Sequence, residues 1–216
     1  FPFKDSEHKK RFTDIVNFSQ LSAMDEERAL EFIDMQIQIL KPIVRKYNGD
    51  WLKEIGDGLL FSFNSSIDAV QCSIEIQRKL KNITEFKIRI GIHQGDIFIK
   101  NNDIFGDDVN IASRVESFAP SGGISISDKV YNDISGVKEI KTSFIGHRKL
   151  KGITQETKVR CITSYDLPKH KVTKLTYVAG YVSYFYGVLA LISIPIYSFI
   201  NYYIFIGSFI QFIQSA

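Results

Sequence analysis

The spacing of hydrophobic positions changes several times along the chain. Between residues 30 and 47, apolar side chains recur every three or four positions, which predicts an amphipathic helix with one buried stripe. The stripe consists of Leu30, Ile33, Ile37, Leu40, Val44 and Tyr47. Acidic residues 25–27 suit the positive N-terminal end of this helix, and we expect Gly49 to end it in a left-handed conformation.

Two short apolar runs flank a Gly-Asp-Gly turn centred on Asp57, which predicts a β-hairpin with an acidic tip. The same reasoning predicts helices at residues 65–80, 107–118 and 128–134, and strands at residues 86–93, 96–99, 123–127, 144–150 and 158–165. Ser65 or Ser66 can cap the first of these helices, and Ser127 can cap the last. Because strands and helices alternate while two strand pairs are hairpins, we expect an α+β fold with a mixed, mainly antiparallel sheet and packed helices.

The C-terminal part, residues 175–216, contains no Asp, Glu, Lys or Arg. An uncharged stretch of this length suffices for one tilted membrane span, or for two short spans separated at Pro195. The alternative, a hairpin of buried helices, would need a second apolar surface that a domain of this size lacks. The sequence therefore predicts a domain at residues 1–167, a basic linker at residues 168–174 and a transmembrane segment at residues 175–216.

Charge and cysteine content narrow the class of protein further. Three lysines in the linker place the preceding domain in the cytoplasm by the positive-inside rule. The net charge is only +3 and is dispersed, which argues against nucleic-acid binding. Cys72 and Cys161 lack metal-ligand spacing and suit a reducing compartment. Since the chain begins with Phe1 and carries no signal peptide there, we expect a truncated or processed N-terminus.

Two aspartates lie where rigid elements end: Asp14 after a short strand and Asp57 on the hairpin tip. Carboxylates held in this way can share hard divalent cations, and the turn after Asp14 can offer backbone N–H groups to phosphate oxygens. Each aspartate alone is more often an ordinary turn residue. Asn110 and Arg114 are four positions apart, so they share a helix face that either contacts a phosphate or is simply solvated. His93 ends an alternating strand, and we expect a structural role for it.

Four segments together resemble the catalytic domain of class III nucleotidyl cyclases, the adenylyl and guanylyl cyclase family, over about residues 12–165. They are FTDIVNFS at 12–19, KEIGDG at 53–58, RIGIHQG at 89–95 and DIFGDDVNIASR at 103–114. None is decisive alone, but they occur in the family's order with comparable separations. The resemblance implies the ferredoxin-like cyclase core.

The resemblance also implies roles for individual residues. Asp14 and Asp57 would bind two metal ions, Mg²⁺ or Mn²⁺, with the Ile15 carbonyl as a further ligand. Lys53 and Asp103 would read the base, and Asn110 and Arg114 would stabilise the transition state. The triphosphate would be bound by Asn17, Phe18, Ser19 and, as a weaker candidate, Lys151.

We therefore expect a membrane-tethered, homodimeric adenylate cyclase that converts ATP to 3′,5′-cyclic AMP and pyrophosphate, with sites shared between subunits. Lysine donates to a ring nitrogen and aspartate accepts from an amino group, which suits adenine better than guanine. The alternatives are a guanylate cyclase, a catalytically silent domain that binds nucleotide or regulates a partner, and a membrane anchor with a folded head. Two features depart from the family pattern: Asn17 stands where many members have glycine, and residues 7–11 are polar where the family has an apolar central strand.

Overall fold

A computed structural model of the chain describes residues 8–95, 98–100, 103–105, 107–150 and 156–170. The strands are β1 (His8–Ile15), β2 (Asp50–Ile55), β3 (Gly58–Phe63), β4 (Ile88–Gly95), β5 (Phe98–Lys100), β6 (Asp103–Phe105), β7 (Ile124–Ser127), β8 (Thr142–Lys149) and β9 (Glu156–Ile162). The helices are α1 (Phe18–Met24), α2 (Glu26–Lys46), α3 (Ser66–Leu80), α4 (Asp107–Glu116) and α5 (Asp128–Ile134), followed by a short 3₁₀ turn (Ser164–Asp166). All belong to one compact unit, Phe1–His170.

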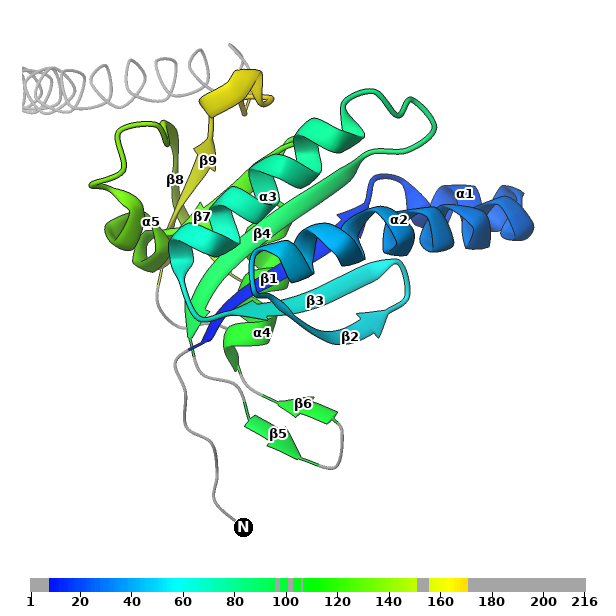
Figure 1. Cartoon of the computed structure of the whole chain (residues 1–216), viewed down its shortest axis with the longest axis horizontal. Coiled ribbons are helices and arrows are strands. Elements are labelled where there is room, and N and C mark those ends of the chain that lie inside the picture. Colours follow the sequence, from blue (N-terminus) through cyan, green and yellow to red (C-terminus); the bar gives the residue numbers. More distant parts are fainter. Residues whose placement is uncertain (1–7, 96–97, 101–102, 106, 151–155, 171–216) are drawn as a thin grey trace, which may run out of the picture. The chain divides into compact units, whose positions relative to one another are not determined.

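Seven strands form the main sheet in the order β2-β3-β1-β4-β7-β9-β8 (Figure 1). The pair β4–β7 is parallel and the other neighbours are antiparallel, so the prediction of a mixed, mainly antiparallel sheet is confirmed. Strands β5 and β6 form a separate two-stranded hairpin. The sequence pattern predicted a strand near β5, whereas β6 was not predicted.

The polar segment that opens the described chain forms a central strand. Strand β1 pairs with β3 on one side, where Lys9 lies opposite Phe63, and with β4 on the other, where His8 lies opposite Gly95. Its backbone is therefore hydrogen-bonded along both edges, although its first residues are charged rather than apolar. The unusual N-terminal sequence is compatible with the fold.

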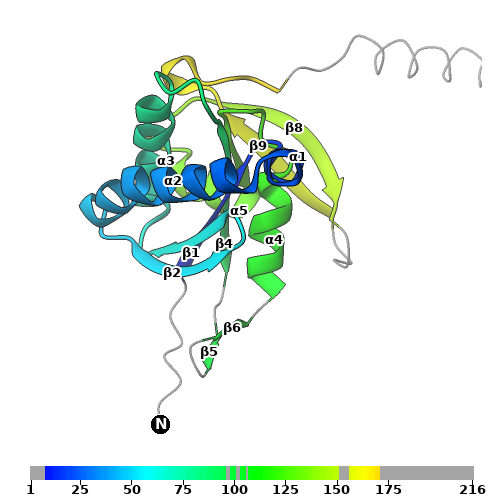
Figure 2. The same cartoon turned by 90° about the vertical axis from the view of Figure 1, so that its right-hand side faces the viewer.

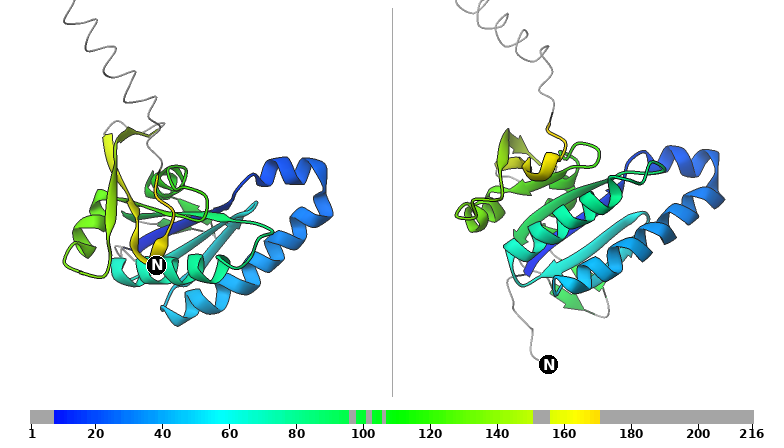
Figure 3. Two further views of the ribbon diagram at one scale, coloured as in Figure 1. Left: turned by 90° about the horizontal axis from the view of Figure 1, so that it is seen from above. Right: turned by 45° about the horizontal axis from the view of Figure 1, so that its top comes forward.

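Helices cover both faces of the sheet. Helices α2 and α3 contact each other and lie over one face, whereas α4 packs on β1, β4 and β7 from the opposite face (Figures 2 and 3). Alternation in β4 explains this arrangement, since Ile88, Ile90 and Ile92 are buried in the core under α2 and α3 while Gly91 faces α4. A smaller apolar cluster of Val115, Leu150 and Val159 supports α4.

The buried stripe of α2 differs from the one that we predicted. Leu30 is exposed, whereas Ala29, Phe32 and Gln36 are buried. The rest of the predicted stripe is confirmed, since Leu40 and Val44 are buried and Ile33, Ile37 and Tyr47 pack against the core. The core face of the helix therefore differs from the prediction in its first half, where it includes a polar residue, Gln36. Periodicity alone could not identify this difference, because apolar residues occupy both sides of the stripe.

The end of α2 also corrects a prediction. The left-handed residue is Asn48, with φ of 54°, and Gly49 does not have a positive φ. Glycine is required at position 49 for a different reason: a Cβ there would lie 2.5 Å from the ring of Phe63 and 2.8 Å from a methyl group of Val44. Close packing selects this glycine.

Ser65 caps α3 as predicted, because its hydroxyl accepts hydrogen bonds from the N–H groups of Ile67 and Asp68. Among the described residues, no helix combines the length and apolar character needed to cross a membrane. The predicted transmembrane segment, residues 175–216, lies outside the described residues, as does Lys151.

Candidate functional site

Asp14 and Ile15 end the central strand β1 and point to opposite faces of the sheet. Ile15 is buried in the core beneath α2 and α3. The preceding Thr13 is buried on the same face, where its hydroxyl accepts hydrogen bonds from the side-chain amide of Gln36 and from the N–H of Leu59, at 3.2 and 3.3 Å. These contacts hold the end of β1, so the half-buried Asp14 is presented on the other face from a rigid strand.

Asp57 reaches the end of β1 from the β2–β3 hairpin. The hairpin has a two-residue turn, in which Gly56 has φ of 61°, and Ile55 pairs with Gly58. The Asp57 carboxylate accepts a hydrogen bond of 2.8 Å from the backbone N–H of Ile15 and lies close enough to Asp14 for the two carboxylates to interact electrostatically. The structure therefore brings together the two aspartates that the sequence singled out.

The turn after β1 places three further candidate residues beside this pair. Asn17 has φ of 63° and ψ of 25°, the left-handed conformation in which glycine is most easily accommodated. Its carbonyl accepts hydrogen bonds from the N–H groups of Gln20 and Leu21 at the start of α1. Phe18 and Ser19 follow in the first turn of that helix.

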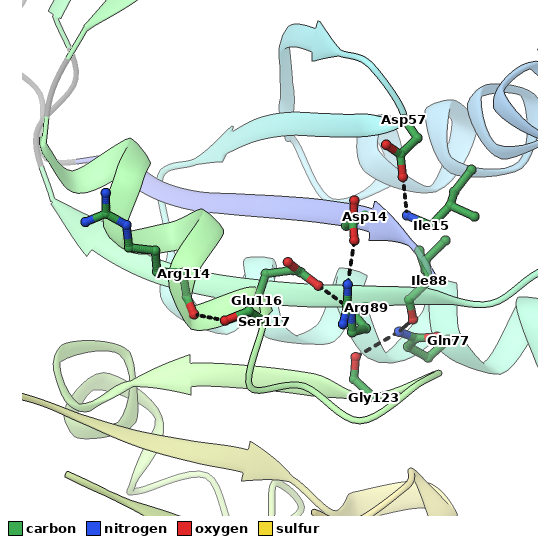
Figure 4. Close-up of polar contacts among 10 residues, drawn as sticks. All are labelled: Asp14, Ile15, Asp57, Gln77, Ile88, Arg89, Arg114, Glu116, Ser117 and Gly123. Atoms are coloured by element: carbon green, nitrogen blue, oxygen red, sulfur yellow. Dashed lines mark hydrogen bonds and ion pairs between the residues drawn. The ribbon is translucent and has the colours of Figure 1, made fainter. Parts of the chain in front are cut away.

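Two charged residues to which the sequence gave no role complete the cluster (Figure 4). Arg89 lies directly opposite Asp14 in the β1–β4 pairing, and its guanidinium contacts the Asp14 carboxylate at 2.7 Å. The same guanidinium contacts the carboxylate of Glu116, in the last turn of α4, also at 2.7 Å. The available signal was a charged residue, Arg89, among the alternating isoleucines of the strand, but its partners depend on strand register.

The cluster holds three carboxylates and one guanidinium, so it carries excess negative charge. Burial and the neighbouring Asp14 carboxylate raise the pKa of Asp57 to about 6, although the hydrogen bond from the Ile15 N–H opposes this rise. Burial raises the pKa of Glu116 to about 7, because Arg89 only partly offsets the desolvation and is shared with Asp14. The site therefore favours binding of a proton or a cation.

A divalent cation fits these residues. Asp14 and Asp57 are adjacent, and the charge of Asp14 contributes to the raised pKa of Asp57. Hard cations prefer carboxylate oxygens as ligands. No cluster of three or more His, Cys, Asp or Glu ligands occurs in the part of the chain that the structure describes. A pair of carboxylates suits Mg²⁺, which commonly takes one or two carboxylates and completes its shell with water and substrate phosphates.

The remaining candidates lie on other elements. Asn110 is exposed on α4, and Arg114, on the same helix, extends its guanidinium away from Asp14 and Asp57 (Figure 4). Lys53 lies in the edge strand β2, opposite Leu60 of β3. The backbone of Asp103 belongs to β6. A single chain thus brings together the aspartates and the Asn17 turn, but not Arg114.

Comparison with known proteins identifies the class. Residues 11–164 match the model of the adenylate and guanylate cyclase catalytic domain. The chain belongs to this family, and the expectation from the four sequence segments is confirmed.

Individual relatives agree with this assignment. The chain is 32% identical over 148 residues to a putative adenylate cyclase 3 of Rhizobium meliloti, a match that covers 65% of this chain and 25% of that protein. An adenylate cyclase of Streptomyces griseus is 27% identical over 124 residues, covering 56% of this chain and 31% of that protein. The chain thus spans between a quarter and a third of the length of these relatives.

Solved structures show the same fold. An adenylate/guanylate cyclase/hydrolase from Silicibacter pomeroyi superposes with a TM-score of 0.69 at 28% identity, covering 78% of this chain and all of that one. The adenylyl cyclase CyaB from P. aeruginosa superposes with a TM-score of 0.68 at 25% identity, also covering 78% of this chain and all of that one.

Proposed function

We propose that this protein is an adenylate cyclase that converts ATP to 3′,5′-cyclic AMP and pyrophosphate. The observation that carries the proposal is the adjacency of Asp14 and Asp57 at the end of β1, beside a left-handed turn that begins α1. Family membership makes a cyclase the appropriate enzyme class. Two acidic residues on rigid elements are what a metal-dependent phosphoryl transfer requires.

In the proposed reaction, the ribose 3′-oxygen attacks the α-phosphorus, and the bond from that phosphorus to the bridging oxygen breaks. Pyrophosphate leaves with the bridging oxygen, and the 3′-hydroxyl proton is lost to solvent. Asp14, Asp57 and the Ile15 carbonyl would hold two divalent ions, Mg²⁺ or Mn²⁺, which supply Lewis-acid stabilisation of the oxygens. The turn at Asn17, Phe18 and Ser19 would bind the triphosphate, with Lys151 as a further contact.

The choice of ATP over GTP rests on Lys53 and Asp103. Lysine can donate a hydrogen bond to an adenine ring nitrogen, and an aspartate can accept one from the adenine amino group. Relatives of known structure include cyclases of both specificities, such as the catalytic core of a rhodopsin-guanylyl cyclase with converted specificity, in complex with ATPαS, at 26% identity. A guanylate cyclase is therefore the alternative that an activity measurement must test.

We propose a homodimer with two shared sites. Arg114 points away from the aspartates of its own chain, which supports the proposal that a second copy brings its Asn110 and Arg114 to the nucleotide. We also propose that residues 175–216 attach the protein to a membrane, because the segment is uncharged for its whole length, with the catalytic domain on the cytoplasmic side.

The test is cyclic-nucleotide formation by the purified chain in lipid or detergent, comparing ATP with GTP in Mg²⁺ and in Mn²⁺. The matched variants are Asp57→Asn, which removes a proposed ligand, and Asp34→Asn, which changes an exposed aspartate of α2. Cyclic AMP formed by the wild type and by the Asp34 variant, but not by the Asp57 variant, would support the proposal. Metal-dependent ATP binding without any product would indicate the catalytically silent domain instead.

A further inference from the structure

A buried histidine links three elements on the α4 side of the sheet. His93 of β4 is 3% exposed. Its Nδ1 atom lies 2.8 Å from the hydroxyl oxygen of Ser127, at the end of β7, and its Nε2 atom lies 3.1 Å from a carboxylate oxygen of Asp108, in the first turn of α4. The imidazole therefore connects the start of α4 to two strands in the middle of the sheet.

The chemistry of Asp108 determines the direction of its hydrogen bond with His93. A carboxylate oxygen of Asp108 accepts, so the Nε2–H group of His93 donates this hydrogen bond. The Nδ1 atom of a neutral imidazole then accepts, and the Ser127 hydroxyl donates to it. The contact with Asp108 is kept in either case, because in an imidazolium Nδ1 donates to the Ser127 oxygen instead while Nε2 still donates to Asp108.

The Ser127 hydroxyl is used for this contact in place of the expected cap. Ser127 occupies the N-cap position of α5, as the sequence predicted, but its side chain makes no capping hydrogen bond. A serine at an N-cap ordinarily accepts from a backbone N–H of the first helical turn. The hydrogen bond to His93 thus replaces an interaction that would have stabilised α5.

A nucleophilic role for this Ser-His-Asp group conflicts with its environment. Ser127 is 1% exposed, so a substrate cannot reach its hydroxyl. The fixed, buried hydrogen bonds instead suit a group that holds neighbouring elements in place.

Helix α4 lies unusually close to β4 along the same face. Residues 89, 91, 93 and 95 alternate on this face of the strand, and they meet helix residues spaced by four. Two of these strand residues make polar contacts with the helix: Arg89 contacts Glu116, and His93 contacts Asp108. The other two are glycines that leave no room for a side chain. A Cβ on Gly91 would overlap the α4 backbone at Ala112 and Glu116, and a Cβ on Gly95 would overlap the Asp108 side chain.

Two polar contacts therefore fix α4, one at each end of its contact with the strand. The contact of Arg89 with Glu116 holds the last turn of the helix next to Asp14. The contact of His93 with Asp108 holds the first turn, two residues before Asn110. Since the glycines in between allow close approach, the helix cannot move along or away from β4 without breaking one of these contacts.

We propose that His93 is a positioning residue that acts through Asp108 to hold the first turn of α4, and with it Asn110 and Arg114, in the geometry that the reaction requires. This inference rests on the proposed cyclase function. His93 itself touches no proposed substrate atom. Loss of the contact should displace Asn110 and Arg114 and slow the chemical step, while ATP binding through the aspartates and the Asn17 turn is largely kept.

The experiment compares Asp108→Ala, which removes the acceptor, with Asp108→Asn, whose side-chain oxygen can still accept from His93. Asp108 is partly exposed, at 23%, so these variants should fold, unlike a substitution of the buried histidine. Ser127→Ala tests the other hydrogen bond of His93. Its matched control is Ser135→Ala, which alters an exposed serine just after α5.

Each full-length variant is measured for kcat and KM with ATP and for hydrogen exchange of residues 107–116. In Asp108→Ala we expect faster exchange in this helix and a kcat lower by about ten- to a hundredfold. The KM should stay within about twofold, because ground-state binding is unaffected. Asp108→Asn should recover most of the slow hydrogen exchange and most of kcat. Ser127→Ala should lower kcat less than Asp108→Ala does, and Ser135→Ala should match the wild type in both measurements.

The proposal is overturned if Asp108→Ala exchanges in α4 as the wild type does, or if Asp108→Asn is as impaired as Asp108→Ala. A wild-type protein that forms no cyclic nucleotide would contradict the proposed function instead. The exchange measurement would still decide whether His93 and Asp108 hold α4.

Discussion

The backbone N–H of Ile15 donates a hydrogen bond of 2.8 Å to the carboxylate of Asp57, a residue 42 positions later in the sequence. This bond ties the tip of the β2–β3 hairpin to the end of β1 and places Asp57 next to Asp14. The position of the acidic pair is thus set by strand pairing, since β3 is hydrogen-bonded to β1 just before Asp14.

The stability of the metal-free protein should fall as pH rises from about 4 to about 7. The pKa of Asp57 is raised from 3.8 to about 6 and that of Glu116 from 4.5 to about 7, so the folded state holds these protons more tightly than the unfolded chain. A raised pKa stabilises the fold at low pH, and this contribution is lost as pH rises through the folded value. Thermal unfolding in EDTA across this range, with a loss of the order of 1–2 kcal/mol, is the check.

Saturating Mg²⁺ should recover stability at pH 7 in the wild type and not in Asp57→Asn, because the ion binds only the folded site. A metal-free stability that is constant or rises between these pH values would contradict the charge balance that we describe for the cluster.

Arg89→Met should destabilise the fold by about 2–3 kcal/mol, because Asp14 and the buried Glu116 lose a shared partner. Replacing Glu116 with Gln in the same chain should recover part of this loss. Lys46→Met is the matched control: its ion pair with Glu75 is exposed, and we expect a change below about 1 kcal/mol. Denaturant unfolding of these variants measures the effect, and equal losses from Arg89 and Lys46 would contradict it.

Asn17→Ala should cost about 1–2 kcal/mol, because alanine at φ of 63° places its Cβ against the backbone, whereas Asn17→Gly should be neutral or slightly stabilising. Both variants are compared by urea unfolding. If alanine is tolerated as well as glycine, the turn before α1 does not require a left-handed residue.

Gly91→Ala should push α4 away from the sheet, since the added Cβ would overlap the helix backbone at Ala112 and Glu116. We expect a loss of about 1–3 kcal/mol and a lower cyclase rate. Gly136→Ala is the control, because a Cβ there meets no atom within 4 Å. Wild-type stability and activity in the Gly91 variant would argue against close packing of α4 on β4.

Lys53→Glu should shift nucleotide preference away from ATP, because a carboxylate accepts hydrogen bonds where lysine donates them. The ratio of kcat/KM for ATP to that for GTP is the measurement. Lys41→Glu serves as the control for the charge change, since Lys41 is an exposed residue of α2. An unchanged ratio in the Lys53 variant would remove the base-reading role.

Short-range pattern was enough to predict most elements of the fold. The β2–β3 hairpin and helices α3 and α5 follow from turn residues, capping and periodicity within a few positions, and the structure has them where they were expected. Patterns failed where several rotations or conformations were equally consistent with the sequence. The burial of Gln36 in place of Leu30 and the left-handed Asn48 are such cases.

The candidate site shows the same division. The sequence by itself determined that Asp14 and Asp57 end rigid elements and, through four segments, which family the chain belongs to. Only the tertiary structure showed that Arg89 joins Asp14 to Glu116 and that His93 joins Asp108 to Ser127. These contacts depend on strand register and on the position at which α4 packs on β4. Both are set by packing between segments far apart in the chain.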